Sequence, residues 1–552
     1  MKLYRGLLCV SFSLLLGTLV LASAQAAPNG AAHRDGLPLG NPGLEETRTT
    51  ETVTSGVTYT RIERGGESRR DFYTVDVAFE GDRAAAEAVA RRLRSDGYRP
   101  RVERVADRAP DDPARGPLGY LVRVGRSTTQ AGADALRAEL AADGYAGTRT
   151  VYTGEDGGKT TGPWVVHVLK VDPDRYDGEL RPELATGVVP ERELLTSISA
   201  RTDSLAAING GYFVIGPNDG TPGDLAGISV LDGDLVSEAV DGRTSLVLPE
   251  GDGEGADVAA LSDGISARSS DGARRLVDGK NRKPGLIRGC GGEGGDAPTE
   301  APKHDFTCTD PSELILFTPA FGATSEPGDG AEAVLDASGR VTALREGRGG
   351  PIPPGGSVLS GTGEGADWLR SHARPGQEVR ISERVTGARV RGGTGVVNGG
   401  PRLLEAGEEE ITAYEEGFVY PEDPEFYYRF GERRNPRTLA GVTRDGDLLL
   451  VAVDGRRPGY SVGASFEEGA AVMDALGSEE AVNLDGGGST GMTVEQRLVT
   501  RPSDTTGERP IGDAIVVAPP SGRRGPLAFG PQPAAALGPA PSAPLGLWLL
   551  AS

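Results

Sequence analysis

One turn of this sequence combines a carboxylate, three consecutive glycines and two hydroxyl side chains. Glycine lets backbone N–H groups approach an anion closely, and the hydroxyls add further donors. A carboxylate beside such a cradle suits the transfer of a phosphate ester or of a glycosyl group. A lone Asp-Gly pair is more often an ordinary tight turn, so the prediction depends on the whole run and on the apolar segment before it. The run consists of Asp485, Gly486, Gly487, Gly488, Ser489 and Thr490.

The segments around this turn predict a strand-helix-strand unit. Residues 448–453 form a continuous apolar run that ends at Asp454, and residues 481–484 form a second run that ends at Asp485. A capping box at residues 465–468 begins a helix between them. A connection of this length joins parallel strands. Both aspartates are therefore expected at the carboxyl edge of one sheet, where ligands bind in sheets of this kind.

Other polar residues lie next to apolar runs in the same way. Asn209 and Asn398 each begin an Asn-Gly-Gly turn, which is either an ordinary hairpin turn or part of a ligand site. Arg437 precedes another strand and offers a planar, bidentate donor for phosphate or carboxylate, although a surface ion pair is the alternative in an acidic chain. Glu508 precedes the last strand-like run, residues 514–517, and has the weakest support from spacing alone.

Composition and missing motifs narrow the classes of function. The 552 residues include 58 Lys and Arg against 80 Asp and Glu, a formal net charge of −22. This balance argues against nucleic-acid binding, because a phosphate backbone needs a basic face. The sequence has no His-Glu-x-x-His or Walker motif, which argues against a zinc protease and a nucleotide-dependent enzyme. None of its histidines stands in a pattern that a catalytic triad would need, which argues against a serine hydrolase.

The chain divides into five predicted parts. Residues 1–27 have a charged start, an apolar run and small residues at their end, as a secretory signal peptide does. Residues 28–68 lack apolar periodicity and are interpreted as a disordered linker. A small module is expected at residues 69–155 and a large domain at residues 160–518. Residues 519–552 form a tail rich in Pro and Ala.

Export and the cysteine count together predict one disulfide. The mature chain is expected to be secreted or cell wall-associated, and no segment after the signal peptide is apolar for long enough to span a membrane. Cleavage of the signal peptide leaves Cys290 and Cys308, which pair most simply with each other in an oxidising compartment. Zinc bound with His304 is a weaker alternative, because it has too few ligands.

The small module contains an internal repeat with an offset of 47 residues. Tyr73 recurs as Tyr120, and Asp-Gly-Tyr at residues 96–98 recurs at residues 143–145. Each unit has the pattern strand, helix, strand, which predicts a βαββαβ sheet with both helices on one face. The module resembles the sporulation-related repeat (SPOR) domain, which binds peptidoglycan glycan strands stripped of their peptides. The resemblance implies a glycan-binding face on the side of the sheet without helices; an unrelated ferredoxin-like spacer is the alternative.

The large domain contains six short motifs in a fixed order. They are Asn-Gly-Gly-Tyr-Phe from residue 209, Asn-Gly-Gly-Pro from 398, Asn-Pro-Arg-Thr from 435, Val-Asp-Gly-Arg from 453, Asn-Leu-Asp-Gly-Gly-Gly-Ser-Thr from 483 and Glu-Arg-Pro-Ile-Gly-Asp-Ala from 508. Together they resemble the phosphodiester glycosidase family, the domain family of the lysosomal enzyme that removes N-acetylglucosamine from its phosphodiester with mannose. The resemblance implies an α+β protein with a ferredoxin-like SPOR domain and a strand-rich, mixed α/β domain. It also implies hydrolysis of a sugar-1-phosphodiester to a free sugar and a phosphomonoester.

The resemblance implies a role for three carboxylates. Asp485 would act at the anomeric carbon, as a nucleophile or as the base for a water. Asp454 or Glu508 would be the second carboxylate that glycosyl transfer usually needs. Such a site could also hold Ca²⁺ or Mg²⁺ beside the phosphate, so no cofactor is assigned.

The resemblance also implies the groups that bind the substrate. Arg437 and the amides of residues 486–488 would clamp the phosphate, and Asn209 and Asn398 would hold sugar hydroxyls. Two other functions stay open: a wall protein that binds phosphorylated glycans without cleaving them, and a metal-dependent phosphodiesterase that cuts the other P–O bond. The remaining substrate-binding candidates are Gly210, Thr438, Arg456, Ser489, Thr490 and Arg509.

Overall fold

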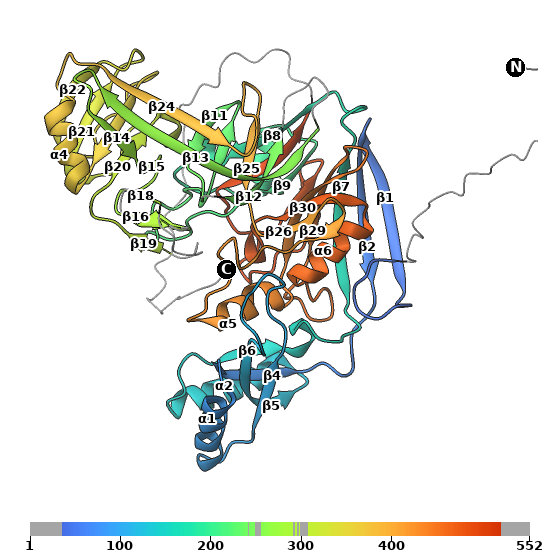
Figure 1. Cartoon of the computed structure of the whole chain (residues 1–552). Coiled ribbons are helices and arrows are strands. Elements are labelled where there is room, and N and C mark those ends of the chain that lie inside the picture. The colour runs from blue at the N-terminus through green and yellow to red at the C-terminus, as the bar shows by residue number, and fades with distance from the viewer. Residues whose placement is uncertain are drawn as a thin grey trace, which may run out of the picture.

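The computed structural model of this chain describes residues 36–240, 242–248, 255–290, 293–294, 297–298 and 307–519. The expected signal peptide and the tail after residue 519 lie outside these residues. Figure 1 shows a small body built from residues 73–152 below a larger body made mostly of strands. The α+β class predicted from the sequence is confirmed. Within the described ranges, the structure contains no helix that is long and apolar enough to cross a membrane.

An eight-stranded sheet joins segments from both ends of the large domain. Its order is β1 (Glu46–Thr54), β2 (Val57–Arg64), β7 (Trp164–Val171), β29 (Leu448–Val453), β28 (Arg437–Thr443), β30 (Ser478–Asn483), β26 (Arg402–Glu405) and β27 (Glu408–Glu409). Because β28 lies between β29 and β30 and pairs antiparallel with each, β29 and β30 run parallel to one another, as the sequence predicted. The helix between them, α6 (Phe466–Ala475), begins at the predicted capping box of Ser465 and Glu468.

The interpretation of residues 28–68 as a disordered linker is wrong for residues 46–64. β1 and β2 form a hairpin, and β2 pairs with β7 along its whole length, from Val57 against Val171 to Arg64 against Trp164. β1 is the edge strand of the sheet and its side chains are mostly exposed, so its sequence has no apolar face to detect.

In the described residues, three further sheets of five or more strands belong to the large domain. A five-stranded sheet has the order β32 (Arg497–Leu498), β31 (Met492–Val494), β9 (Ala206–Asn209), β33 (Asp513–Ala518) and β8 (Glu179–Leu184). A seven-stranded sheet contains β11 (Asp234–Ser237), β10 (Ser229–Leu231), β25 (Gly395–Asn398), β12 (Arg243–Leu248), β13 (Asp257–Ser269), β14 (Arg274–Val277) and β24 (Val379–Thr386). The outermost sheet contains β15 (Gly279–Lys280), β20 (Leu314–Phe317), β23 (Ser357–Gly361), β21 (Gly328–Leu335) and β22 (Val341–Arg348), with α4 (Gly363–His372) against β21 and β23.

One buried core joins the sheets that carry the predicted turns. Leu450 and Val482 of the eight-stranded sheet share this core with Ile208 and Ile515 of the five-stranded sheet and with Val397 of β25. All five side chains are fully buried. This packing fixes the ends of β9, β25 and β30 relative to one another.

The small body has the predicted βαββαβ order. It consists of β3 (Tyr73–Glu80), α1 (Arg83–Ser95), β4 (Pro100–Val105), β5 (Gly119–Ser127), α2 (Gln130–Ala142) and β6 (Arg149–Tyr152), in the antiparallel sheet order β4-β5-β3-β6. Both helices pack on one face, where Val75 and Val122 share a core with Leu93 and Leu140. The other face is not open to solvent: Leu121 and other residues of this face belong to the core of the large body.

The predicted disulfide between Cys290 and Cys308 is present. It lies beside the hairpin of β16 (Leu286–Arg288) and β19 (Thr307–Thr309), in which Ile287 pairs with Cys308. The two other short strands of this region, β17 (Glu293–Gly294) and β18 (Ala297–Pro298), pair with each other.

We predict that Ile62→Ala in β2 lowers the free energy of unfolding by about 2–4 kcal/mol, because Ile62 is fully buried and its loss leaves a cavity. The matched control, Thr50→Ala on the exposed strand β1, should change it by less than about 0.5 kcal/mol. Urea unfolding of the mature chain measures both values. Equal and negligible effects of the two substitutions would contradict the packing of this hairpin.

Candidate active site

The side chain of Asn209 joins three segments at the end of β9. Its Nδ2 donates to the carbonyl of Asp485 at 2.7 Å. Its Oδ1 accepts from the hydroxyl of Thr438 at 2.7 Å and from the N–H of Gly491 at 3.1 Å. Asn209 is fully buried, so these bonds exchange with no solvent. The turn at residues 485–490 therefore lies beside Asn209 and Thr438, as predicted. The Asn209 amide, however, bonds to protein groups and is not available to bind a sugar hydroxyl.

Asn398 has a similar role at the end of β25. Its Oδ1 accepts from the backbone N–H of Tyr212 at 2.8 Å, and its Nδ2 donates to the Tyr212 carbonyl at 3.3 Å. The hydroxyl of Tyr212 donates to the carbonyl of Gly400 at 2.7 Å, and Asn483 donates to that hydroxyl at the same distance. Both Asn-Gly-Gly turns thus belong to one buried network beside Asp485. Asn398, like Asn209, positions backbone.

A second carboxylate, Asp513, stands beside the predicted turn. Asp513 begins β33 and is 1% exposed, and its Oδ1 accepts from the N–H of Gly211 at 2.9 Å. The Gly210 backbone connects it to Asp485: the Gly210 N–H donates to the Asp513 carbonyl, and the Gly210 carbonyl accepts from the Asp485 N–H. A Cβ at Gly210 would lie 2.3 Å from Asp513 Oδ1, so only glycine fits there. The Gly210 backbone therefore sets the separation between Asp485 and Asp513.

The two carboxylates differ in their surroundings. Burial, and then the charge of Asp485, raise the pKa of Asp513 from 3.8 to about 7, although the Gly211 N–H opposes this. The Oδ2 atom of Asp513 is buried and meets no hydrogen-bond partner within the described part of the chain. Asp485 is only half-buried, and its Oδ1 accepts from the N–H of Gly486 at 2.9 Å. A carboxyl that titrates near neutrality beside another carboxylate is typical of proton transfer in catalysis.

The glycines of the turn bring two arginines close to its backbone. A Cβ at Gly488 would lie 2.2 Å from Nη2 of Arg509, and one at Gly487 would lie 3.3 Å from Nη1 of Arg456. Two of the three glycine amides are already used, because Gly486 donates to Asp485 and Gly487 donates to a backbone carbonyl. The predicted backbone cradle therefore reduces to the Gly488 amide, and the guanidinium groups provide the other donors.

Arg456 and Arg509 are held by neutral and acidic neighbours. Arg456 donates through Nε and Nη2 to Oδ1 of Asn435 at 3.1 and 2.9 Å. Its backbone is left-handed, with φ of +53°. Residues other than glycine rarely adopt this conformation outside turns and functional sites. Arg509 makes a two-pronged ion pair with Asp504 at 2.9 and 3.1 Å.

A third arginine, Arg192, adds to this positive charge. Burial, followed by the charge of Arg509, lowers the pKa of Arg192. Burial also lowers the pKa of Arg456, and Arg509 adds to this effect. The charge of Arg509 thus opposes the protonation of both Arg192 and Arg456, and an anion bound beside these guanidinium groups would relieve this repulsion. Next to them, the buried hydroxyl of Ser489 meets no hydrogen-bond partner in the described residues.

Arg437 is oriented differently from the prediction. Its Nε donates to the carbonyl of Ala464 at 2.9 Å, its Nη2 donates to the carbonyl of Phe430, and its guanidinium lies 4.3 Å from the ring centroid of Phe466. Burial lowers the pKa of Arg437 to about 10. Arg437 thus connects the segment before β28 to α6. The arginines that lie against the glycine turn are instead Arg456 and Arg509.

Asp454 and Glu508 also lie in other contacts. The carboxylate of Asp454 bonds to Nε2 of His167 at 3.1 Å and accepts from the hydroxyl of Tyr460 at 2.9 Å and from the N–H of Arg501 at 3.0 Å. Glu508 accepts from the N–H and the hydroxyl of Thr196 at 2.8 and 2.9 Å, which caps the first turn of α3 (Leu195–Arg201). Both carboxylates hold loops that carry site arginines.

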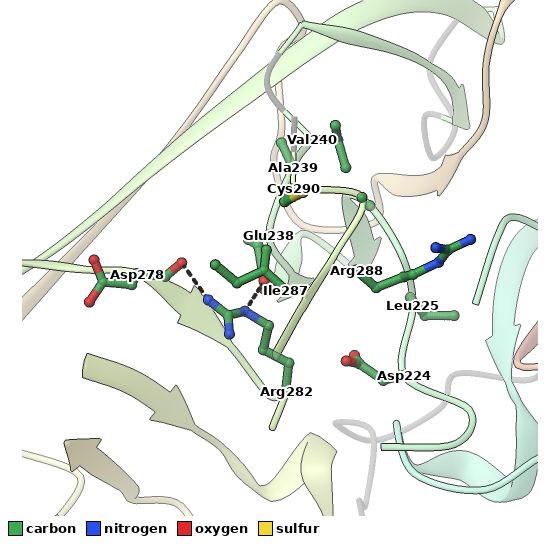
Figure 2. Close-up of a pocket in the computed structure, with 12 residues that line it drawn as sticks. Asp224, Leu225, Glu238, Ala239, Val240, Asp278, Arg282, Ile287, Arg288 and Cys290 are labelled. Atoms are coloured by element: carbon green, nitrogen blue, oxygen red, sulfur yellow. Dashed lines mark hydrogen bonds and ion pairs between the residues drawn. The ribbon is translucent and has the colours of Figure 1, made fainter. Parts of the chain in front are cut away.

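A small cavity lies beside Cys290 of the disulfide (Figure 2). It is lined by Asp224, Glu238 and Asp278 around Arg282, which donates to Glu238 at 2.5 Å and to the Asp278 carbonyl at 3.1 Å. Its volume of about 20 Å³ holds one water, so it has no room for a sugar. Burial, and then the charge of Glu238, raise the pKa of Asp224 well above its usual range.

The residues around the turn fit an anion better than a metal ion. Across the described ranges, no three His, Cys, Asp or Glu side chains gather closely enough to hold a cation. Asp485 and Asp513 are the acidic groups at the turn, and they share it with Arg456 and Arg509. Ca²⁺ and Mg²⁺ prefer several oxygen ligands without cationic neighbours, so the donor set does not fit them and no step is assigned to a metal.

We predict that Asp513→Asn changes how stability depends on pH. The folded carboxyl binds its proton more tightly than the unfolded one, so its contribution to stability is greatest below pH 3.8 and falls as the pH rises to about 7. Between pH 4 and pH 8, the wild-type chain should lose up to about 4 kcal/mol relative to Asp513→Asn, which cannot ionise. Denaturant unfolding at both pH values measures this difference. Parallel curves would contradict the burial of an ionisable carboxyl.

Comparisons with known proteins agree with this architecture. The phosphodiester glycosidase family matches residues 329–518, and the SPOR domain family matches residues 70–147. The crystal structure of a Burkholderia pseudomallei K96243 protein, described as exported, is 35% identical with a TM-score of 0.81, and the match covers 88% of this chain and 98% of that chain. A search of curated proteins found no match.

Two other solved structures share less with this chain. A hypothetical protein from Synechocystis is 18% identical with a TM-score of 0.50, over 86% of this chain and 81% of that one, and shows a similar fold. The zebrafish N-acetylglucosamine-1-phosphodiester alpha-N-acetylglucosaminidase catalytic domain, auto-inhibited by its pro-peptide, is 17% identical with a TM-score of 0.31, over 64% and 77% of the two chains. From the family matches and the 35% identical structure, this chain belongs to the phosphodiester glycosidase family and carries an N-terminal SPOR domain.

Proposed function

We propose that this protein is an exported, wall-associated hydrolase that cleaves a sugar-1-phosphodiester, such as an N-acetylglucosamine-1-phosphodiester, at its glycosidic bond. The SPOR domain implies peptidoglycan binding, and the Burkholderia protein of similar structure is described as exported. The observation that carries the proposal is the pair Asp485 and Asp513 beside the arginines of the glycine turn. Carboxylates suit glycosyl transfer, and guanidinium groups suit a phosphate.

The arginines would bind the phosphate that leaves. A phosphomonoester has a second pKa near 6, so it departs from the anomeric carbon as an anion and needs little help from a proton donor. It does need its growing negative charge to be neutralised. Arg456 beside Gly487 and Arg509 beside Gly488 would neutralise this charge, and the Ser489 hydroxyl would add a donor.

The two carboxylates would act on the sugar. Asp485, half-buried at the mouth of the turn, would face the anomeric carbon and stabilise its positive charge. Asp513, whose pKa is about 7, would accept the proton of the attacking water. In this step the bond from water oxygen to the anomeric carbon forms, the bond from that carbon to the phosphate oxygen breaks, and its electron pair leaves with the phosphomonoester.

Asn209 and Asn398 would contribute by holding the turn rather than by binding sugar hydroxyls. Their amides hold the Asp485 carbonyl and the Tyr212 backbone. Since Asp485 is fixed through its carbonyl, loss of the Asn209 amide should move the carboxylate away from the reacting carbon.

The experiment uses the mature chain and an N-acetylglucosamine-1-phosphodiester with a reporter alcohol, followed by phosphorus NMR. We expect a phosphomonoester and free N-acetylglucosamine, and a rate at least about 100-fold lower for Asp485→Asn with the fold intact. Sugar-1-phosphate as the product would mean cleavage of the other P–O bond. No turnover across several sugars would favour a protein that only binds phosphorylated glycans.

A matched pair of glycine substitutions tests the phosphate site in the same assay. Gly488→Ala places a methyl group where the Arg509 guanidinium lies, so KM for the diester should rise about tenfold or more. Gly264→Ala, in β13, has open space around the new methyl group and should leave KM unchanged. Equal kinetics of the two variants would contradict a phosphate site at this turn.

A further inference from the structure

The centre of the sheet face expected to bind glycan strands is buried against the large domain. On this face Arg123 of β5 is 2% exposed, and it donates to the hydroxyl of Tyr428 at 3.0 Å. Its guanidinium also pairs with both oxygens of Asp156 at 2.6 and 2.9 Å. The ring of Phe79 in β3 stacks on the ring of Tyr428 with centroids 5.5 Å apart. Figure 1 shows the covering segment, α5 (Pro424–Tyr427), directly above β6.

An ion pair and two hydrogen bonds also join the SPOR domain to the large domain at the edges of this interface. Arg149 of β6 forms an ion pair with Glu425 of α5. The carboxylate of Asp111 accepts from the backbone N–H groups of Tyr414 and Glu415, both at 2.9 Å. The interface thus combines an aromatic core, a buried arginine with several acidic partners, and polar contacts around them. While the two domains are docked, a glycan strand has no access to the centre of this face around Arg123, although Arg101 and Glu103 of β4 at its edge stay partly exposed.

The docked interface continues to the proposed phosphate site. Arg433 directly follows η4 (Tyr428–Glu432), which continues α5, and it pairs with Asp156 at 2.8 Å and with Glu155 at 2.7 Å. The carbonyl of Arg433 accepts from Nδ2 of Asn435 at 3.0 Å. Oδ1 of the same Asn435 accepts from Arg456 at 3.1 and 2.9 Å. A short chain of direct contacts therefore connects the SPOR sheet to Arg456.

We propose that glycan strands and the large domain compete for one face of the SPOR sheet, and that docking of this face holds Arg456 in its phosphate-binding position. The second part rests on the proposed function of the Arg456 site. In the docked state the phosphate site is complete and the sheet face is closed. Binding of a glycan strand to the sheet face releases the segment 425–435 and weakens the phosphate site.

The charge pair of Arg149 and Glu425 allows a direct test in the full mature chain. Both side chains are partly exposed, so reversing one charge weakens docking without leaving a charge in the core. Glu425→Arg leaves the SPOR domain unchanged, Arg149→Glu leaves the large domain unchanged, and the double variant restores opposite charges. The measurements are hydrogen exchange of residues 425–435, binding to peptide-free glycan strands, and binding of inorganic phosphate.

We expect Glu425→Arg to speed exchange of residues 425–435 at least fivefold, to bind glycan strands at least fivefold more tightly, and to bind phosphate at least threefold more weakly. The double variant should return toward the wild type in all three. Wild-type binding of glycan strands with full protection of residues 425–435 would overturn the competition. Faster exchange with unchanged phosphate affinity would overturn the link to Arg456. None of these readouts requires turnover, so a failure of the proposed hydrolysis is seen separately in the NMR assay.

Discussion

The three hydrogen bonds of the Asn209 side chain are the constraint on which the site depends. They join the ends of strands from two sheets to the turn that begins at Asp485. Because the amide is fully buried, each of its bonds must be satisfied within the protein. The Gly210 backbone then spaces Asp485 from Asp513, and no side chain fits at that position. The geometry of the two carboxylates follows from this one asparagine and its glycine.

Charge separation completes the arrangement. Arginines gather on the glycine side of the turn and carboxylates on the Gly210 side, in a chain that is strongly acidic overall. A phosphate between the arginines would relieve their mutual repulsion, and a neutral sugar would lie against the carboxylates. The loops that present the arginines depend on Asp454, Glu508 and Asn435, each of which is fixed by buried or partly buried contacts. The SPOR domain contributes to the same scaffold through its docked sheet.

The elements next to the catalytic turn could be predicted because their signals are local. The apolar runs before Asp454 and Asp485 and the capping box between them lead to two parallel strands joined by a helix, as the structure shows. The strand β1 could not be predicted, since an exposed edge strand has no apolar face. Asp513 lies in the motif that begins at residue 508, but its role could not be predicted, because its chemistry arises from burial against β9, far away in sequence. Which arginine faces the turn depends in the same way on packing, so Arg437 was a reasonable but misplaced choice for the phosphate.

Hydrolysis in ¹⁸O-labelled water tests the central claim most directly, because it identifies the bond that breaks. If Asp485 and Asp513 direct water to the anomeric carbon, the label is found in the released sugar, and the phosphomonoester carries none. Mass spectrometry of both products after a single turnover reads this distribution. Label in the phosphate, with none in the sugar, would show attack at phosphorus and would contradict the roles assigned to the two carboxylates.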